Sequence, residues 1–268
     1  MKKTNLILII ILCNFSISGQ SDTVSAETQI YDFARFLMSN KLYDFAAQEY
    51  ERLNFMYPGN RQYTKELVTA YRLGNKFELI SNKIRILNQT DKHITLDYVL
   101  AALKNDLLPS ARQTFNEAEL INVQELKPVV YKVNFGMMLI EGNLNINTNI
   151  DDAYLKKLYT EYKERPYKSP VTAGIFSAII PGSGRFYTND YKNGIISLLF
   201  IAGTVWQANS RFQKNGVTST GGWIYAGLGL GFYLGNIYGS IRSAKVINEV
   251  TKKKIDEKTK YYITNLMF

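Results

Sequence analysis

Few side chains in this sequence are of the types that catalyse reactions at neutral pH. His93, in TDKHITLDY, is the single histidine, and Cys13 is the single cysteine. A lone histidine in a helical segment is more typical of a solvated or capping side chain than of a catalytic base. The motifs HExxH, CxxC and GxSxG, which carry metal-dependent, thiol and serine-nucleophile chemistry, do not occur in the sequence. We therefore predict a protein that is not an enzyme and that uses neither a metal nor a cofactor.

Three groups of charged residues are candidates for other roles. Asp190 lies close to Arg185 in the sequence, and such a pair can fix a turn at a membrane surface or, alternatively, place a polar group in a small pore. Asp151 and Asp152 precede a helical pattern, where carboxylates favour the positive end of the helix dipole. The lysines at 252–254 indicate contact with a membrane surface rather than a nucleic-acid site.

The most regular spacing in the chain belongs to small residues. Five of them recur every four positions and so form one row along a helix face: Gly227, Gly231, Gly235, Gly239 and Ser243. Each helical glycine costs about 1 kcal/mol relative to alanine in water, so the row requires a packing reason. In lipid, small residues let helix backbones approach closely. We predict that the row packs against the apolar segment at 194–208 or, in a competing use, against a second copy of the chain.

A second motif surrounds the sequence IIPGSGRFYTNDYKNG. Its spacing does not fit a phosphate-binding loop, since GxxxxGK[ST] is missing and no predicted strand precedes it. The stretch resembles the TM2-like and PGxGxxY-type membrane-hairpin domains of bacteria, in which this element precedes two membrane helices. The matching residues are Pro181, Gly182, Gly184 and Tyr187, with Asp190 and Gly194 behind them. The resemblance covers residues 171–250, and it implies membrane residence without implying an activity.

Three apolar segments lie in this region, after a basic linker at 163–170. They cover 171–180, 194–208 and 223–241, and the second and third contain no charged residue. The third segment has the length that a bilayer core requires, whereas the second is short for it. Tryptophans and tyrosines lie near the segment ends, as interfacial aromatic residues do. We predict a transmembrane hairpin of the second and third segments, with the first as a short interfacial or re-entrant element, and both two and three spans remain open.

The region before the linker has helical periodicity from about residue 29 to residue 164. Apolar and aromatic residues form two stripes here: Tyr31, Ala34, Leu37 and Met38, then Leu42, Phe45, Ala46, Tyr50 and Leu53. A polar break at 39–41 separates the stripes, and Pro58-Gly59 ends the second. Two amphipathic helices joined by a tight turn make an αα-hairpin. Further helical patterns follow, one of them starting at Leu108-Pro109.

Residues 29–62 resemble a tetratricopeptide repeat. The small Ala46 and Ala47, the aromatic Tyr50 and the closing Pro58 lie about where that repeat places such residues. The later segments lack the small-residue pattern, so a generic helical solenoid is nearly as good a description as a true repeat array. One hairpin cannot bury its apolar face alone, so at least three should stack. The resemblance implies a groove that binds a peptide or protein, and the alternative is a folded spacer.

The N-terminus, MKKTNLILIIILCNFSISGQ, has the pattern of a secretory signal peptide. An uncleaved anchor helix and lipoprotein processing at Cys13 are the alternatives. Charge then separates the rest of the chain, because residues 171–268 hold 11 lysines and arginines against 4 acidic residues, whereas residues 21–170 are neutral. We expect a signal peptide at 1–20, a repeat-like helical domain at 21–165, a membrane helical domain at 166–250 and a basic tail at 251–268.

These patterns together predict an all-α protein, a tetratricopeptide-like solenoid of αα-hairpins followed by a transmembrane helical hairpin. We expect an exported scaffold whose helical domain faces the periplasm, anchored in the inner rather than the outer membrane. Its partners would be a protein of unidentified kind and membrane lipid, with no nucleic acid, and it would form a homo-oligomer if the glycine row meets its own copy. The alternative function is a component of a transport or channel assembly formed by the C-terminal helices.

Overall fold

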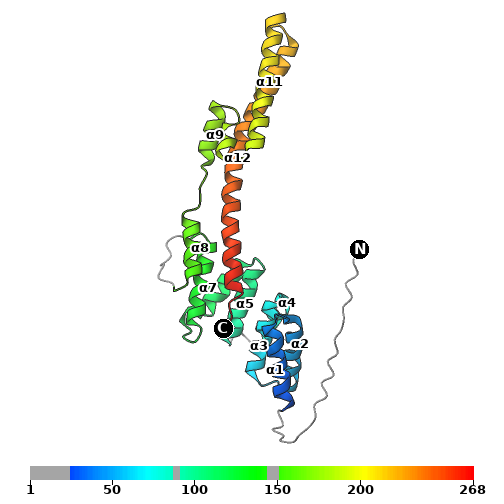
Figure 1. Cartoon of the computed structure of the whole chain (residues 1–268), viewed down its shortest axis with the longest axis vertical. Helices are drawn as coiled ribbons and strands as arrows, with labels where there is room; N and C mark the ends of the chain where they lie inside the picture. The colour runs from blue at the N-terminus through cyan, green and yellow to red at the C-terminus, as the bar shows by residue number, and fades with distance from the viewer. Residues whose placement is uncertain (1–24, 87–90, 144–150) are drawn as a thin grey trace, which may run out of the picture. The chain divides into compact units, whose positions relative to one another are not determined.

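The computed structural model describes residues 25–86, 91–143 and 151–268. Every regular element in these ranges is a helix (Figure 1), which confirms the all-α class. The chain forms two compact units, Met1–Gly74 and Asn75–Phe268, and each is described by itself below. The signal peptide expected at 1–20 lies outside the described residues.

The first unit contains α1 (Ala26–Ser39), α2 (Tyr43–Met56) and α3 (Arg61–Leu73). Ser25 caps α1 by accepting a hydrogen bond from the backbone N–H of Thr28, and Asn60 caps α3 in the same way. Lys41, in the predicted break, has a φ of 60°, which lets the chain reverse between α1 and α2. The expected αα-hairpin is therefore present at residues 26–56.

The core of this hairpin follows most of the predicted stripes. Its buried residues include Ala34 and Leu37 from α1, and Ala46, Tyr50 and Leu53 from α2. Two members of the second stripe were assigned to the wrong face, since Phe45 is 58% exposed and Leu42 is 44% exposed. Both residues lie at the start of α2, where the buried face is instead taken by the pair of adjacent alanines at 46 and 47.

The second unit begins with helices that share one apolar core. Their bounds are α4 (Phe77–Ile86), α5 (Lys92–Lys104), α6 (Leu108–Glu117), the 3-10 helix η1 (Leu120–Asn122), α7 (Lys127–Ile140) and α8 (Ala153–Lys163). The helix predicted to start at Leu108-Pro109 does so, with the proline in its first turn. Fully buried leucines and valines of α5 and α7 form the centre of this core.

The remaining helices of this unit are α9 (Pro170–Ile179), α10 (Ser183–Tyr187), α11 (Tyr191–Asn215) and α12 (Thr220–Thr264). With 45 residues, α12 is about 67 Å long at the usual rise per residue. Its first half packs against α11, α9 and α10, and its last turns contact α5, α7 and α8 (Figure 1). A single helix therefore joins two groups of helices within the unit.

This arrangement differs from the expected division at 165/166 and from a separate tail at 251–268. Residues 251–264 continue α12, and Ile255 and Ile263 lie in the shared apolar core. Ile263 approaches Gly136 of α7 so closely that a methyl group on that glycine would overlap it. The basic segment thus completes the packing of α5–α8.

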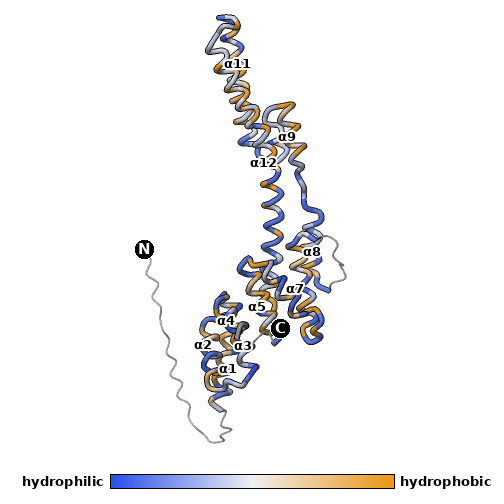
Figure 2. Tube along the Cα trace, turned by 180° about the vertical axis from the view of Figure 1, so that it is seen from behind, coloured by the Kyte–Doolittle hydropathy of each residue, from blue (hydrophilic) through white to orange (hydrophobic). Residues whose placement is uncertain are grey.

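Figure 2 shows apolar residues along α9, α11 and the first half of α12, and polar residues over the middle of α12. Within the described ranges, none of the helices is both long enough and apolar enough to span a membrane. The expectation of two membrane-spanning helices is therefore not met. The physical reason is composition: glycines, tyrosines and Asn236 interrupt the apolar residues of α12, and the apolar run of α11 is short.

Candidate functional site at the junction of α9, α10 and α12

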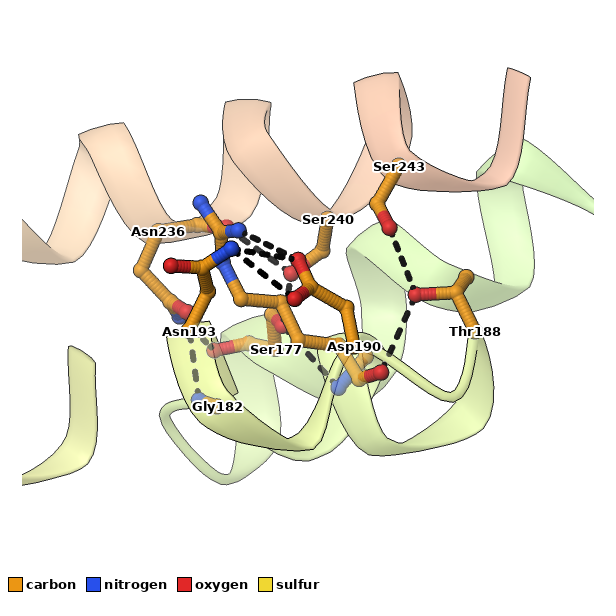
Figure 3. Close-up of polar contacts among 10 residues, drawn as sticks. Ser177, Gly182, Thr188, Asp190, Asn193, Asn236, Ser240 and Ser243 are labelled. Carbon is orange, nitrogen blue, oxygen red and sulfur yellow. Dashed lines mark hydrogen bonds and ion pairs between the residues drawn. The ribbon is translucent and has the colours of Figure 1, made fainter. Parts of the chain in front are cut away.

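The predicted PGSG motif forms the turn between α9 and α10 (Figure 3). Gly182 has a φ of 88°, a left-handed conformation that favours glycine, and it precedes the first residue of α10. Its backbone N–H donates to Asn236 Oδ1 of α12 at 3.2 Å. Asn236 in turn donates from Nδ2 to the carbonyl of Ser177 in α9 at 3.3 Å. One buried amide side chain of α12 therefore links the turn to α9.

A chain of hydroxyl groups continues this network through the buried interior. Gly184 N–H donates to Ser177 Oγ at 3.0 Å, and Ser177 Oγ lies 2.6 Å from Ser240 Oγ. Ser240 Oγ donates to the carbonyl of Asn236 at 2.9 Å, so the proton shared by the two hydroxyls comes from Ser177. Ser177 and Ser240 are fully buried. Each hydroxyl both donates and accepts, which is the condition for such a network to stabilise a fold.

The motif glycines permit the close approach that these hydrogen bonds need. A Cβ on Gly184 would overlap the carbonyl oxygen of Ala173 in α9, and a Cβ on Gly182 would overlap the carbonyl oxygen of Gly194 in α11. Gly194 itself lies against the ring of Phe186, and a Cβ on Gly194 would be only 3.0 Å from that ring. Gly182, Gly184 and Gly194, which were predicted as one motif, are thus brought together in one small volume.

Pro181 lies in this turn, and Tyr187 is the last residue of α10. The Tyr187 hydroxyl accepts a hydrogen bond from Ser169 N–H at 3.1 Å, and its ring packs edge-on against Phe176 at 5.6 Å between centroids. Lys168 Nζ lies 4.7 Å from the centroid of the same ring. Pro181 is half-buried and ends α9. Tyr187 therefore fixes the start of α9 onto α10.

Asp190 forms an ion pair with Arg185. Such a pair was one of the two roles predicted for Asp190, the other being a polar group in a small pore. Arg185 Nη1 and Asp190 Oδ2 lie 2.9 Å apart, and Asn193 Nδ2 donates to both carboxylate oxygens at 2.8 and 3.1 Å. Arg185 Nε is buried and has no hydrogen-bond partner among the described residues. The guanidinium lies against the backbone of α12 at Gly239, where a side chain would overlap it. The ion pair thus joins α10, α11 and α12.

The predicted glycine row is divided by the structure into two parts. A Cβ on Gly227, Gly231 or Gly235 would have no heavy atom of another element within 4 Å. Gly239 makes room for Arg185, and Ser243 Oγ lies 2.8 Å from the hydroxyl of Thr188. The predicted packing of α11 on the row is not seen, and self-association through its open part stays a prediction.

The contacts between α11 and α12 use another row that sequence reasoning missed. The ring of Phe212 packs on Gly222 and the side chain of Thr204 packs on Gly229. Gly222, Gly229 and Asn236 are buried and are spaced by seven residues, as at a helix–helix seam. The seven-residue spacing of these small and polar residues in the sequence could have indicated this contact. The glycine row at every fourth position is the more regular pattern and led to a different prediction.

The other charged candidates lie in the group of helices that packs on the end of α12. Asp152 accepts a hydrogen bond from Leu155 N–H at 2.9 Å and so caps α8, which confirms the predicted helix start. It also contacts Lys132 Nζ at 3.0 Å and accepts from the Tyr262 hydroxyl at 2.7 Å. Burial raises the pKa of this carboxyl, but the three hydrogen bonds outweigh burial and hold the pKa below its ordinary 3.8.

His93 and the lysine run have structural partners in the same group. His93 N–H donates to the capping Asp91, and its ring stacks 6.0 Å from the ring of Phe268. Lys252 Nζ donates to the carbonyl of Ile140 at 2.9 Å and pairs with Asp256. Lys252, the first of the three lysines predicted to contact a membrane surface, therefore contributes to the packing of α12 on α7.

The polar groups at the junction of α9, α10 and α12 form hydrogen bonds with one another. In the ranges that the structure describes, no cluster of histidine, cysteine, aspartate and glutamate side chains could hold a metal ion. The junction connects α9, α10 and α12 through buried polar contacts, and α11 through the partly buried pair of Arg185 and Asp190. Comparisons of the chain with protein-family models, with curated proteins and with solved structures give no match.

Proposed function

We propose that this protein is a non-enzymatic scaffold of the cell envelope, held at a membrane by α9, α11 and the first half of α12. The observation that carries the proposal is the number of large apolar side chains that these helices leave exposed. We call these side chains the apolar band, and its members include Val171, Ile175, Ile179, Ile195, Ile196, Leu199, Phe200, Val205, Leu228, Leu230, Phe232 and Leu234. Proteins dissolved in water rarely expose apolar patches of this extent unless a partner or a membrane covers them.

Aromatic residues support a lipid environment for the band. Trp206 is 68% exposed and Trp223 is 63% exposed, and both lie towards the end of the α11–α12 hairpin. Tyr191 and Tyr238 are exposed towards the other end. Tryptophan and tyrosine gather at the two edges of a bilayer's apolar region because one part of each side chain is apolar and another is polar. Exposed tryptophans and tyrosines beside the apolar band therefore support contact of these helices with lipid.

The buried polar junction also suits such an environment. Ser177, Asn236 and Ser240 direct their polar atoms at one another and at backbone groups of the turn, so these atoms do not face the band. Among helices in lipid, side-chain hydrogen bonds and small residues supply the association that apolar contacts cannot supply. The junction would therefore hold α9, α10 and α12 together where lipid surrounds them.

The helical hairpins would supply the binding of a protein partner. The first unit resembles a tetratricopeptide repeat at residues 29–62, and it exposes aromatic side chains that do not contribute to its own core. Phe33, Phe36, Phe45 and Phe55 are each at least half exposed, and the rings of Phe33 and Phe36 stack 6.5 Å apart. Aromatic residues of this kind are enriched in protein–protein interfaces. Anchoring one partner at a membrane raises its effective concentration for others there.

Membrane fractionation of cells that express the full-length protein tests the location. We expect the protein to sediment with membranes, to resist extraction by high salt and to enter solution with detergent. A variant with Leu199→Gln, Leu228→Gln and Leu230→Gln should shift to the soluble fraction. A matched variant with three polar exchanges in the first unit, Gln29→Ser, Gln48→Ser and Gln62→Ser, should not. Wild-type protein that stays in the supernatant after high-speed centrifugation would contradict the proposal.

A further inference from the structure

We propose that four cations at one level of the α9–α12 group bind the anionic headgroups of phospholipids. We call them the basic girdle: Lys168, Lys192, Arg242 and Lys245. The inference rests on the proposed membrane location, and it adds the lipid class and the residues that select it. It distinguishes these four cations from the lysines at 252–254, for which the sequence also predicted contact with a membrane surface.

Hydrogen bonds fix Lys168 against α12 near Lys245. The backbone N–H of Lys168 donates to Asn248 Oδ1 at 2.9 Å, and its carbonyl accepts from Asn248 Nδ2 at 2.8 Å. Asn248 lies one turn beyond Lys245 on the same helix. The Lys168 ammonium lies 4.7 Å from the centroid of the Tyr187 ring, which holds it against α10.

The start of α11 brings Lys192 towards the same level. Thr188 Oγ1 and Ser243 Oγ lie 2.8 Å apart, which places the end of α10 beside the α12 turn that contains Arg242 and Lys245. Lys192 follows Thr188 by four residues and is exposed. Cations from the linker before α9, from α11 and from α12 therefore gather around one section of the unit.

The girdle cations are free for an external anion. Within the described residues, no carboxylate lies within ion-pair distance of Lys192, Arg242 or Lys245, and Asp190 is occupied by Arg185 and Asn193. By contrast, Lys252 pairs with Asp256 and Lys253 with Glu257. Residues 166–250 contain seven lysines and arginines and two acids, Asp190 and Glu249. A group of cations with so few acids nearby favours an anionic surface.

The position of the girdle identifies the anion as a lipid headgroup. Val171, 69% exposed, follows Lys168 by three residues, and Tyr238, 66% exposed, precedes Arg242 by one turn. The cations therefore lie at the edge of the apolar band, where the phosphates of a bilayer would be if the band contacts the acyl chains. Cations immediately beside an apolar membrane segment are attracted to anionic lipids over about one Debye length.

Binding of purified full-length protein to vesicles tests the inference. Vesicles of phosphatidylcholine alone are compared with vesicles that also contain phosphatidylglycerol, at low and high salt. We expect phosphatidylglycerol to raise the partition coefficient at least about 10-fold at low salt and high salt to remove the increase. The variant Lys168→Gln, Arg242→Gln, Lys245→Gln should lose this increase and keep its binding to phosphatidylcholine. The control variant Lys253→Gln, Lys254→Gln should keep both.

The outcomes separate this inference from the proposed function. Binding to phosphatidylcholine with no increase from phosphatidylglycerol overturns the girdle and leaves the membrane location, whereas no binding to either vesicle overturns both. An equal loss in the control variant, or full competition by inorganic phosphate at constant ionic strength, also overturns the lipid assignment. If the triple variant loses its helical circular dichroism, the single exchanges Arg242→Gln and Lys245→Gln are measured, and each should remove part of the increase.

Discussion

Ser177 of α9 and Ser240 of α12 are fully buried and share a hydrogen bond of 2.6 Å, although 63 residues separate them in the chain. Ser177 also accepts the N–H of Gly184, so it connects the PGSG turn to α12. Ser177→Ala should lower the free energy of unfolding by about 1–3 kcal/mol, because a buried N–H then lacks an acceptor. Urea unfolding in detergent measures the loss.

A double-mutant cycle checks that the two serines act as a pair. Ser240→Ala alone also breaks the contact, so the double variant should lose clearly less stability than the sum of the single variants. Ser210→Ala, an exchange on α11 outside the junction, is the matched control and should change little. Strictly additive losses would show that the two hydroxyls are not coupled.

The two groups of glycines should respond oppositely to alanine. Gly184→Ala forces a methyl group onto the carbonyl of Ala173 and should disrupt the packing of α9 on α10. Gly231→Ala and Gly235→Ala meet open space in one copy of the chain, so each should stabilise α12 by roughly 0.5–1 kcal/mol. Thermal melting of the three variants in detergent gives the order of stability.

Leucine at the open glycines distinguishes a free helix face from an interface between copies. Gly231→Leu and Gly235→Leu should leave the monomer folded, since no other element lies against these positions. If the open part of the row joins two copies, the same variants should reduce chemical cross-linking between chains in native membranes. Wild-type cross-linking in both variants would exclude self-association through this face.

Local patterns were sufficient for most elements of this fold. The αα-hairpin at 26–56, the cap at Asp152 and the helix start at Leu108 all follow from apolar spacing, capping residues and proline, which act within a few residues. The PGSG turn was also recognisable, because its glycines are required by a left-handed φ at Gly182 and by close backbone approach at Gly184.

Contacts between segments that are distant in the sequence could not be predicted from such local patterns. Charge and the run of lysines indicated a tail after residue 250, but Ile255 and Ile263 pack into a core formed mainly by residues 96–162. The role of Asn236 cannot be predicted from the sequence, because a single asparagine in an apolar helix carries no local signal. Its role depends on Gly182 and Ser177 lying opposite it. Such pairings are properties of the packed helices rather than of either segment.

Asp152 should make the stability of the second unit depend on pH in the acidic range. Its pKa in the folded chain lies below 3.8, so the unfolded chain binds more protons, and stability rises with pH through this window. Asp152→Asn should therefore cost about 1–3 kcal/mol at neutral pH, and the difference from wild type should shrink as the pH falls below 3.8. Urea unfolding between pH 2 and pH 7 measures both values.

Asp256 provides the opposite case and hence a control. Burial raises the pKa of this carboxyl above 3.8, against the hydrogen bond from Lys252, and its Oδ1 is buried with no hydrogen-bond partner in the described part of the chain. Ionisation of the Asp256 carboxyl therefore lowers the free energy of unfolding as the pH rises through the pKa that this group has in the folded chain. Asp256→Asn should cost less at neutral pH than Asp152→Asn, and a larger loss would contradict this account.

The stacked rings of Phe33 and Phe36 on α1 should matter for partner binding and not for folding. Both side chains are at least half exposed, whereas Leu37 on the same helix is buried. Phe33→Ser with Phe36→Ser should leave the melting temperature of the first unit within a few degrees of wild type, because surface exchanges cost little. Leu37→Ala should lower the stability of the first unit by about 2–5 kcal/mol through the cavity that it leaves.

Cross-linking in native membranes then reports partner capture, and the double serine variant should lose the cross-linked species that wild-type protein forms. Retention of those species by the serine variant would place the binding surface elsewhere on the helices.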